Sequence, residues 1–177
     1  MTQLSVRNAE IADATVLSVL ATEVWLDTYA KEGVSPAYAT HLHERYSPAA
    51  FQKSLQAAEE QTLICAQGQF VLGYAKLLTG QSLAAPEHGT VELATLYVRR
   101  HHKRQGVGLK LLRHALSLAS EASHSALFLT VHHANHDAIA FYEAQGFRNA
   151  GEWTFRFEDI VVPNLVMKIA LQSAESA

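Results

Sequence analysis

The first third of the chain places apolar residues at helical spacing. Within 11–29 they recur every three or four positions, which predicts a helix whose buried side is formed by Leu17, Leu20 and Val24. Residues 4–7 are typical of a short strand. Asn8 lies between the two patterns and is predicted to cap the helix.

Two serine–proline pairs indicate where the next helices begin. Serine is a good N-cap and proline is tolerated at the first helical position, so short helices are predicted from Pro36 and from Pro48. Beyond them the apolar residues form the shorter runs that are typical of strands. The expected strands cover 62–66, 70–78, 91–98, 127–131, 151–157 and 164–171.

Two further helices are predicted among these strands. One covers about 109–119 and begins at Leu109, and the other begins at His136. Its helical spacing predicts that the longer helix buries Leu109, Leu112, Leu116 and Ala119. Hairpins are expected through Gly68 and around 158–163, and a polar loop over 80–89. We find neither a repeat nor a second domain, so the chain is predicted to form one domain over 1–171, followed by a frayed tail at 172–177.

A basic loop with two glycines separates the strand at 91–98 from the longer helix. Residues 99–104 contain four of the 14 lysines and arginines and none of the 17 acidic residues. N–H groups at a helix start lack partners and lie at the positive end of the helix dipole, so the amides of 105–108 can bind phosphate oxygens. The spacing is neither G-x-G-x-x-G nor G-x-x-x-x-G-K-[ST]. The loop therefore predicts a different kind of phosphate site.

Two motifs in this order resemble the GNAT acetyltransferase superfamily. The loop Lys103-Arg-Gln-Gly-Val-Gly108 is similar to the family's [QR]-x-x-G-x-[GA] segment, with lysine at the first position. The stretch 127–147 is similar to a second family pattern, in which an apolar strand is followed by Asn135 and by a short helix carrying Ala-x-x-Phe-Tyr142 and a Gly-Phe stop. The resemblance implies a single-domain α/β fold of mixed α+β type. In this fold a central, twisted and mostly antiparallel sheet is flanked by helices, and two splayed strands hold coenzyme A.

The resemblance also implies acetyl-CoA as the cosubstrate and assigns its contacts. The pyrophosphate would bind the loop residues Lys103, Arg104, Gln105, Gly106, Val107 and Gly108. The pantetheine arm would bind the main chain of Leu96, Tyr97 and Val98, and Asn135 would contact that arm or shape the helix start. No metal is expected, because the histidines near position 132 lack the spacing of a zinc site.

Attack on a thioester requires a neutral amine. An amine with a pKa near 10.4 is about 3.4 units from neutrality at pH 7, so its deprotonation costs about 4.6 kcal/mol. The resemblance implies Glu92 as the base, acting directly or through water, and Tyr142 as the general acid for the departing thiolate. A solvent-facing Glu92 and a Tyr142 that only packs remain open alternatives. Cys65 lies in an apolar run and is predicted to be buried, not nucleophilic.

The charge of the remaining chain favours a cationic acceptor. Ten acidic residues and five basic ones precede Arg99. The segment 24–29 and the short helices after it faintly resemble bacterial polyamine and small-amine acetyltransferases. Carboxylates and aromatic faces both suit a cation, and the candidate acceptor contacts are Glu23, Trp25, Asp27 and Tyr29.

These observations predict an N-acetyltransferase that moves an acetyl group from acetyl-CoA to a primary amine by direct attack, with a small cationic amine favoured. Two alternatives stay open: a protein or peptide amine as acceptor, and a non-catalytic acyl-CoA sensor with the same fold. A basic patch confined to one loop argues against nucleic-acid binding. With no apolar run near the roughly 20 residues of a membrane span and no leader segment, we expect a soluble, cytoplasmic protein. The resemblance also allows a homodimer.

Overall fold

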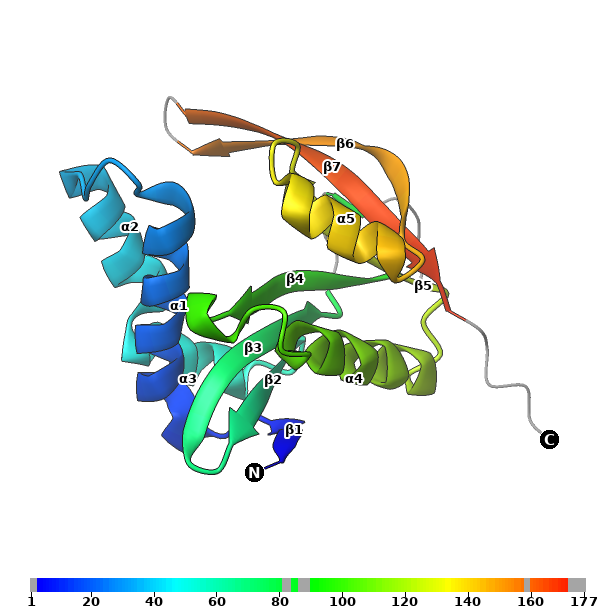
Figure 1. Cartoon of the computed structure of the whole chain (residues 1–177), viewed down its shortest axis with the longest axis horizontal. Coiled ribbons are helices and arrows are strands. Elements are labelled where there is room, and N and C mark those ends of the chain that lie inside the picture. The colour runs from blue at the N-terminus through cyan, green and yellow to red at the C-terminus, as the bar shows by residue number, and fades with distance from the viewer. Residues whose placement is uncertain (1–2, 81–83, 86–89, 158–159, 172–177) are drawn as a thin grey trace. The chain divides into compact units, whose positions relative to one another are not determined.

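The computed structural model describes residues 3–80, 84–85, 90–157 and 160–171. Its strands are β1 Leu4–Asn8, β2 Glu60–Gln67, β3 Phe70–Leu78, β4 Thr90–Val98, β5 Ala126–His132, β6 Arg148–Phe157 and β7 Ile160–Ala170 (Figure 1). Its α-helices are α1 Ala14–Tyr29, α2 Pro36–Tyr46, α3 Pro48–Gln56, α4 Val107–Glu121 and α5 His136–Ala144, with short 3-10 helices at η1 Ile11–Asp13 and η2 Arg100–His102. The predicted tail, most of the predicted 80–89 loop and part of the expected turn at 158–163 lie outside the described residues.

The strands follow the order β1-β2-β3-β4-β5-β7-β6 in one sheet. The pairs β1–β2, β5–β7 and β6–β7 are antiparallel, and β4–β5 is parallel, which confirms the predicted mostly antiparallel sheet. The chain divides into two compact units. The first comprises Met1–Leu77 with Thr95–Ala115, and the second Leu78–Ala94 with Leu116–Ala177.

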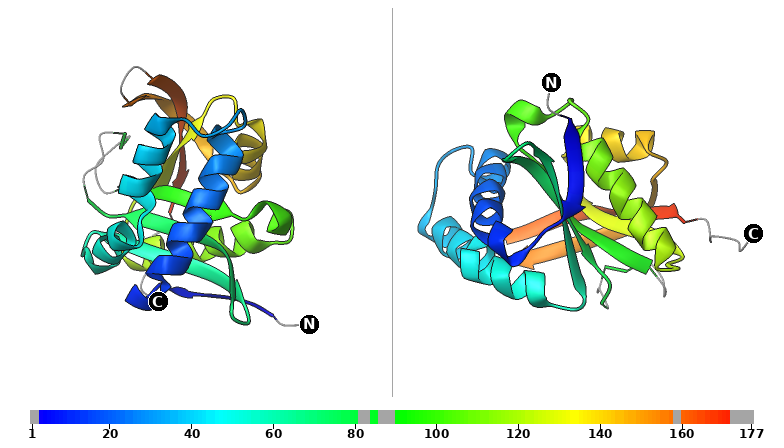
Figure 2. Two further views of the ribbon diagram at one scale, coloured as in Figure 1. Left: turned by 90° about the vertical axis from the view of Figure 1, so that its left-hand side faces the viewer. Right: turned by 90° about the horizontal axis from the view of Figure 1, so that it is seen from below.

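The core of the first unit combines α1 and α3 with β2 and β3. Leu17, Leu20 and Val24 are buried as predicted, and they belong to one cluster with Phe51 of α3 and Tyr74 of β3. In Figures 1 and 2, α1 and α3 lie on one face of β2 and β3, and α4 begins on the other face. The amphipathic pattern of α1 thus fixes which side of this helix meets the strands.

The two serine caps are confirmed. The Ser35 hydroxyl accepts a hydrogen bond from the N–H of Tyr38 at 3.2 Å, and the Ser47 hydroxyl accepts one from the N–H of Ala50 at 3.2 Å. In both helices proline follows the cap directly. These starts are set within four residues of chain, which is why the sequence predicts them.

The predicted cap at Asn8 is wrong. Asn8 is the last residue of β1, and its side-chain oxygen accepts a hydrogen bond from Gln61 at 3.2 Å. The turn before α1 is closed instead by Asp13, whose carboxylate accepts the N–H of Glu10 at 2.7 Å and pairs with Arg7 at 2.7 Å. A long-range strand contact therefore removed Asn8 from the helix start.

The buried face of α4 is shifted from the predicted one. Leu112 and Ala119 are buried as expected, but Leu109 and Leu116 are only half-buried. Three residues that were not predicted to be buried form the rest of this face, namely Val107, Leu111 and Ala115. Cys65 of β2 is buried as expected, and burial raises the pKa of its thiol, which leaves it a poor nucleophile.

In the second unit β5 pairs with strands on both sides. It pairs with β4 over Thr90–Glu92 and with β7 along its whole length. The β6–β7 hairpin contains a register shift between Asn149 and Gly151, where the φ of +143° suits only glycine. Both hairpin strands begin earlier than predicted, at Arg148 and Ile160, because the two strands pair from Arg148↔Lys168 to Phe157↔Ile160.

Candidate active site

The loop before α4 has the backbone geometry of an anion site. Arg104 and Gly106 have φ values of +60° and +82°, which turn the chain sharply into the helix. The N–H of Lys110 donates to the carbonyl of Gly106 at 2.9 Å and closes the first helical turn. The N–H groups of the three residues between them therefore have no acceptor within the helix. They are free to bind phosphate oxygens.

The loop is held in shape from within. The side-chain amide of Gln105 donates to the carbonyl of His101 at 2.8 Å, and the N–H of Lys103 donates to the carbonyl of Arg100 at 3.3 Å. Arg100, Lys103 and Arg104 are exposed, so three positive charges lie next to the unpaired N–H groups along the chain. All six predicted pyrophosphate contacts, 103–108, fall in this one turn.

Arg99, the fourth basic residue of 99–104, forms an ion pair with a residue of α1. The Nε of Arg99 donates to both carboxylate oxygens of Glu23, at 2.8 and 3.1 Å. The main-chain N–H of Arg99 also donates to the carbonyl of Leu72 at 3.0 Å. Arg99 therefore links the end of β4 to α1 and to β3, and its charge is already compensated.

Gly73 of β3 allows a close approach that the sequence analysis missed. A Cβ at this position would lie 2.6 Å from the carbonyl oxygen of Tyr97, 3.3 Å from Cα of Val98 and 3.2 Å from Val107 at the start of α4. Only glycine leaves room for these three residues, which were all predicted to bind the cofactor. A glycine in the middle of an apolar strand is the signal that identifies such a position.

The predicted pantetheine contacts lie at the end of β4. These three residues, Leu96, Tyr97 and Val98, are half-buried. Within strands that the structure describes in full, β4 pairs with β5 only over Thr90–Glu92. Main-chain groups of 96–98 thus lie beyond the ladder that joins β4 to β5.

In the second unit, Asn135 shapes the start of α5. Its side-chain oxygen accepts the N–H of Ala138 at 3.2 Å, and its own N–H donates to the carbonyl of His132 at 2.8 Å. Shaping this helix start is one of the two roles predicted for Asn135. The helix ends at Ala144, and Gly146 follows the C-cap with a φ of +95°.

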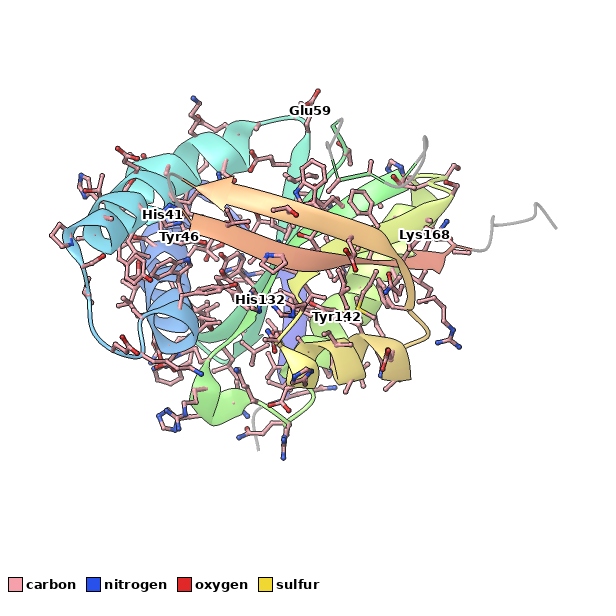
Figure 3. The ribbon with its side chains drawn as sticks, turned by 90° about the horizontal axis from the view of Figure 1, so that it is seen from above. His41, Tyr46, Glu59, His132, Tyr142 and Lys168 are labelled. Atoms are coloured by element: carbon pink, nitrogen blue, oxygen red, sulfur yellow. The ribbon has the colours of Figure 1, made fainter. Side chains whose placement is uncertain are left out.

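Tyr142 is buried on the same helix, with 8% of its surface exposed. Its ring packs 5.5 Å from that of Phe147 and 5.3 Å from that of Phe141 (Figure 3 labels Tyr142 on α5). Burial raises the pKa of Tyr142, so the phenol is protonated at neutral pH. It can donate a hydrogen bond but not readily lose its proton.

Glu92, the predicted base, lies in β4 opposite Phe128 of β5. Its side chain is half-buried, and no ion pair involves it among the residues that the structure describes. The predicted site residues therefore fall into two sets. The loop and strand residues 96–108 belong to the first unit, and Glu92, Asn135 and Tyr142 belong to the second.

The candidate acceptor contacts on α1 have different surroundings. Glu23 is engaged by Arg99, whereas Asp27 is exposed. The rings of Trp25 and Tyr29 lie 5.2 Å apart. The sequence analysis missed two aromatic partners of Trp25 on α2, namely Tyr38 and His41, and the ring of Tyr46 that contacts His41. The three-residue spacing of Tyr38 and His41 is the signal in the sequence, because it puts both on one side of the helix.

The described residues offer neither a cluster suited to a metal ion nor a helix suited to a membrane. Within 3–80, 84–85, 90–157 and 160–171, no group of three or more His, Cys, Asp and Glu side chains is arranged to hold a metal ion. In the same residues no helix has the length and apolar character needed to cross a bilayer. The rings of His132 and His133 lie 4.8 Å apart, and Nδ1 of His132 accepts the N–H of Ala134 at 3.1 Å.

Comparison with known families and curated proteins gives one family. A model described as the acetyltransferase (GNAT) family matches residues 23–147. N-acetyltransferase family 8 member 3 of Rattus norvegicus is 30% identical over 86 residues, which is 48% of this chain and 38% of the relative. The match thus spans well under half the length of that curated protein.

Comparison with solved structures shows the same fold. The PaiA N-acetyltransferase of Thermoplasma acidophilum, solved with coenzyme A, has a TM-score of 0.74 at 19% identity over 95% of this chain and 99% of the other. An N-acetyltransferase of Staphylococcus aureus Mu50 has a TM-score of 0.75 at 19% identity over 96% and 99%. The Salmonella typhimurium protein yncA, described as a putative acetyltransferase and solved with acetyl-CoA, has a TM-score of 0.68 at 20% identity over 98% and 96%.

Proposed function

Because the chain belongs to the acetyltransferase (GNAT) family, we propose that it transfers an acetyl group from acetyl-CoA to a primary amine by direct attack of the amine on the thioester. The observation that carries the proposal is the turn at 103–108. Its positive φ values, unpaired N–H groups and exposed cations are the features that bind a pyrophosphate. Two solved relatives in fold hold coenzyme A or acetyl-CoA.

The residues of the first unit bind and orient the cosubstrate. The N–H groups of Val107, Gly108 and Leu109 take the phosphate oxygens, and the main chain of 96–98 hydrogen-bonds the pantetheine arm. The absence of a side chain at Gly73 lets the end of β4 and the start of α4 pack closely against β3. A main-chain N–H of β4 near the thioester polarises its carbonyl and stabilises the oxyanion that forms during attack. Acetyl-CoA supplies the activated acetyl group.

Glu92 acts as the general base, and Tyr142 acts as a hydrogen-bond donor to the leaving group. Glu92, directly or through water, accepts the proton of the ammonium and so offsets the roughly 4.6 kcal/mol cost of deprotonation at pH 7. Tyr142 donates a hydrogen bond to the departing sulfur. Since its pKa is raised while that of a thiol is near 8.5, it stabilises the thiolate by this hydrogen bond more than by full proton transfer.

The acceptor is a small cationic amine in this proposal. Asp27 supplies an exposed carboxylate and Trp25 an aromatic face, both of which attract a cation. A protein amine is the competing acceptor, since two proteins with this fold are described as ribosomal-protein alanine N-acetyltransferases, at 18% and 21% identity. Identity this low supports only a shared fold. The residues of this chain therefore decide the proposal, and they favour a small amine.

The test is thiol release from acetyl-CoA, read with a disulfide dye, over a panel of small amines, amino acids and peptides. We expect turnover with a small primary amine. Turnover with peptides alone would replace the acceptor class. Binding of acetyl-CoA without turnover on any amine would favour a sensor over an enzyme, and absence of binding would contradict the role of the turn at 103–108.

A further inference from the structure

A group of aromatic rings lies on the helices that precede β2. We define the aromatic cluster as Trp25, Tyr29, Tyr38, His41 and Tyr46. Trp25 is at its centre, with ring centroids 5.2 Å from Tyr29, 5.1 Å from Tyr38 and 5.4 Å from His41. The ring of His41 lies 6.2 Å from that of Tyr46 (Figure 3 labels both residues on α2). All five residues belong to the first unit.

The aromatic cluster continues the core outward but is not part of it. Phe51 and Tyr74, the next rings inward, are 3% and 1% exposed. In the cluster, Tyr29 is 48% exposed, and the other four are half-buried. Among the residues of α2 only Leu42 is buried, so this helix adds little to the core. Large rings concentrated at a surface are typical of a binding site.

The cluster carries little net charge. Glu23 of α1 is compensated by Arg99, and Asp27, two residues from both Trp25 and Tyr29, projects from another side of α1. On α2, Glu44 is followed directly by Arg45. Burial lowers the pKa of His41, and Arg45 lowers it further, so at neutral pH this ring is uncharged. Several aromatic faces with little charge among them suit a single cation.

A pair of hydroxyls connects the cluster to β4. The hydroxyl oxygens of Tyr46 and Tyr97 lie 3.4 Å apart, and either one can be the donor. Only one hydrogen lies between them, so the pair has a second O–H to donate and a lone pair with which to accept an N–H. Burial raises the pKa of Tyr97, so it remains protonated. Tyr97 is also one of the strand residues that we place on the pantetheine arm.

We propose that the aromatic cluster and the Tyr46–Tyr97 hydroxyl pair form an acceptor site for a primary amine joined by a short chain to an aromatic ring. The ring of such an acceptor packs against Trp25 and its neighbours, and its single positive charge is attracted by the adjacent aromatic faces. The hydroxyl pair accepts an N–H of the amine and orients its lone pair. A polyamine, with two or more charges and no ring, fits this arrangement less well. The inference rests on the proposed acetyltransferase function.

The reaction at this site is balanced without a further reactant. The amine nitrogen forms a bond to the acetyl carbon while the carbon–sulfur bond breaks. The nitrogen, which arrives as an ammonium, loses two protons: one passes through Glu92 to solvent before the attack and the other leaves as the amide forms, while the coenzyme A thiolate takes up one. The hydroxyl pair holds the amine and is not consumed.

The experiment compares acceptors on the intact chain. We measure kcat/KM for 2-phenylethylamine and tryptamine, with hexylamine as the apolar amine without a ring and spermidine as the polyamine. The expected result is that both aromatic amines exceed spermidine by about tenfold or more and exceed hexylamine by a smaller factor. Spermidine or hexylamine as the better acceptor overturns the inference, while the proposed function stands. Turnover with no amine defeats both.

Two conservative variants test the hydroxyl pair. Tyr46→Phe and Tyr97→Phe each keep the ring, and each is expected to lower kcat/KM for the aromatic amine about tenfold with KM for acetyl-CoA unchanged. Tyr74→Phe is the matched control, because it removes a hydroxyl from a neighbouring core ring outside the pair. If both pair variants behave like Tyr74→Phe, the hydroxyl pair does not contact the acceptor and the inference is wrong.

Discussion

The close approach at Gly73 leads to a quantitative prediction for Gly73→Ala. A Cβ here lies 2.6 Å from the carbonyl oxygen of Tyr97, whereas an ordinary contact begins at 3.4 Å. The main chain of β3 and β4 must therefore separate by roughly 0.8 Å, because the obstacle is backbone and cannot rotate away. Overpacking of this kind costs about 1–3 kcal/mol of the free energy of unfolding.

The same shift acts on the proposed cofactor contacts. Tyr97 and Val98 carry main-chain groups that we place on the pantetheine arm, and Val107 is the first residue of α4. A displacement near 1 Å at such groups typically costs about a hundredfold in activity. We therefore expect Gly73→Ala to weaken acetyl-CoA binding by one to two orders of magnitude, on the order of 1.4–2.8 kcal/mol.

Isothermal titration with acetyl-CoA and denaturant unfolding measure the two effects separately. Gly33→Ala is the control, since Gly33 has a φ of +130° with nothing within 4 Å of a Cβ. It should lose stability through backbone strain but bind acetyl-CoA normally. If Gly73→Ala binds acetyl-CoA as tightly as the unchanged protein, the close approach has no part in positioning the cofactor, and our reasoning about this glycine is wrong.

Three further predictions concern acid–base side chains, two in the proposed reaction and one in the stability of the fold. Tyr142→Phe should lower kcat about tenfold to a hundredfold while acetyl-CoA affinity in titration changes little, and equal losses in both would indicate a packing role. Glu92→Gln should lower kcat/KM about a hundredfold at pH 7, with the loss shrinking toward pH 10 as the free amine becomes neutral, so a pH-independent loss would exclude a base. The hydrogen bond from Arg7 lowers the pKa of Asp13, so this pair should stabilise the fold above the ordinary carboxyl pKa and cease to do so as pH falls through the lowered value. Denaturant unfolding of Asp13→Asn should then show a deficit at pH 7 that vanishes at low pH.

Features set by neighbouring residues were predicted from the sequence. The caps of Ser35 and Ser47 and the turn around Gly106 each depend on hydrogen bonds or φ angles within a few positions. Burial of α1 followed from the apolar spacing alone. The order of the two motifs was enough to indicate the family, which the match over 23–147 confirms.

Features that depend on distant residues were missed or predicted wrongly. Asn8 failed as a cap because β2 binds its side chain. The charge of Glu23 is engaged by Arg99, 76 positions away, which no local pattern reveals. Gly73 lies within a predicted strand, and only the nearby carbonyl of Tyr97 shows why glycine is needed there.

The sequence by itself determined the elements, the phosphate turn and the family, because these depend on spacing, φ preferences and helix termini that act over one or two turns of chain. The tertiary structure determined which of the candidate site residues remain available to contact a substrate or cofactor. It engages Glu23 in an ion pair, buries Tyr142 so that its phenol stays protonated, and brings Tyr46 within 3.4 Å of Tyr97. Pairing, burial and close approach depend on which elements meet, and local residue preferences do not encode that.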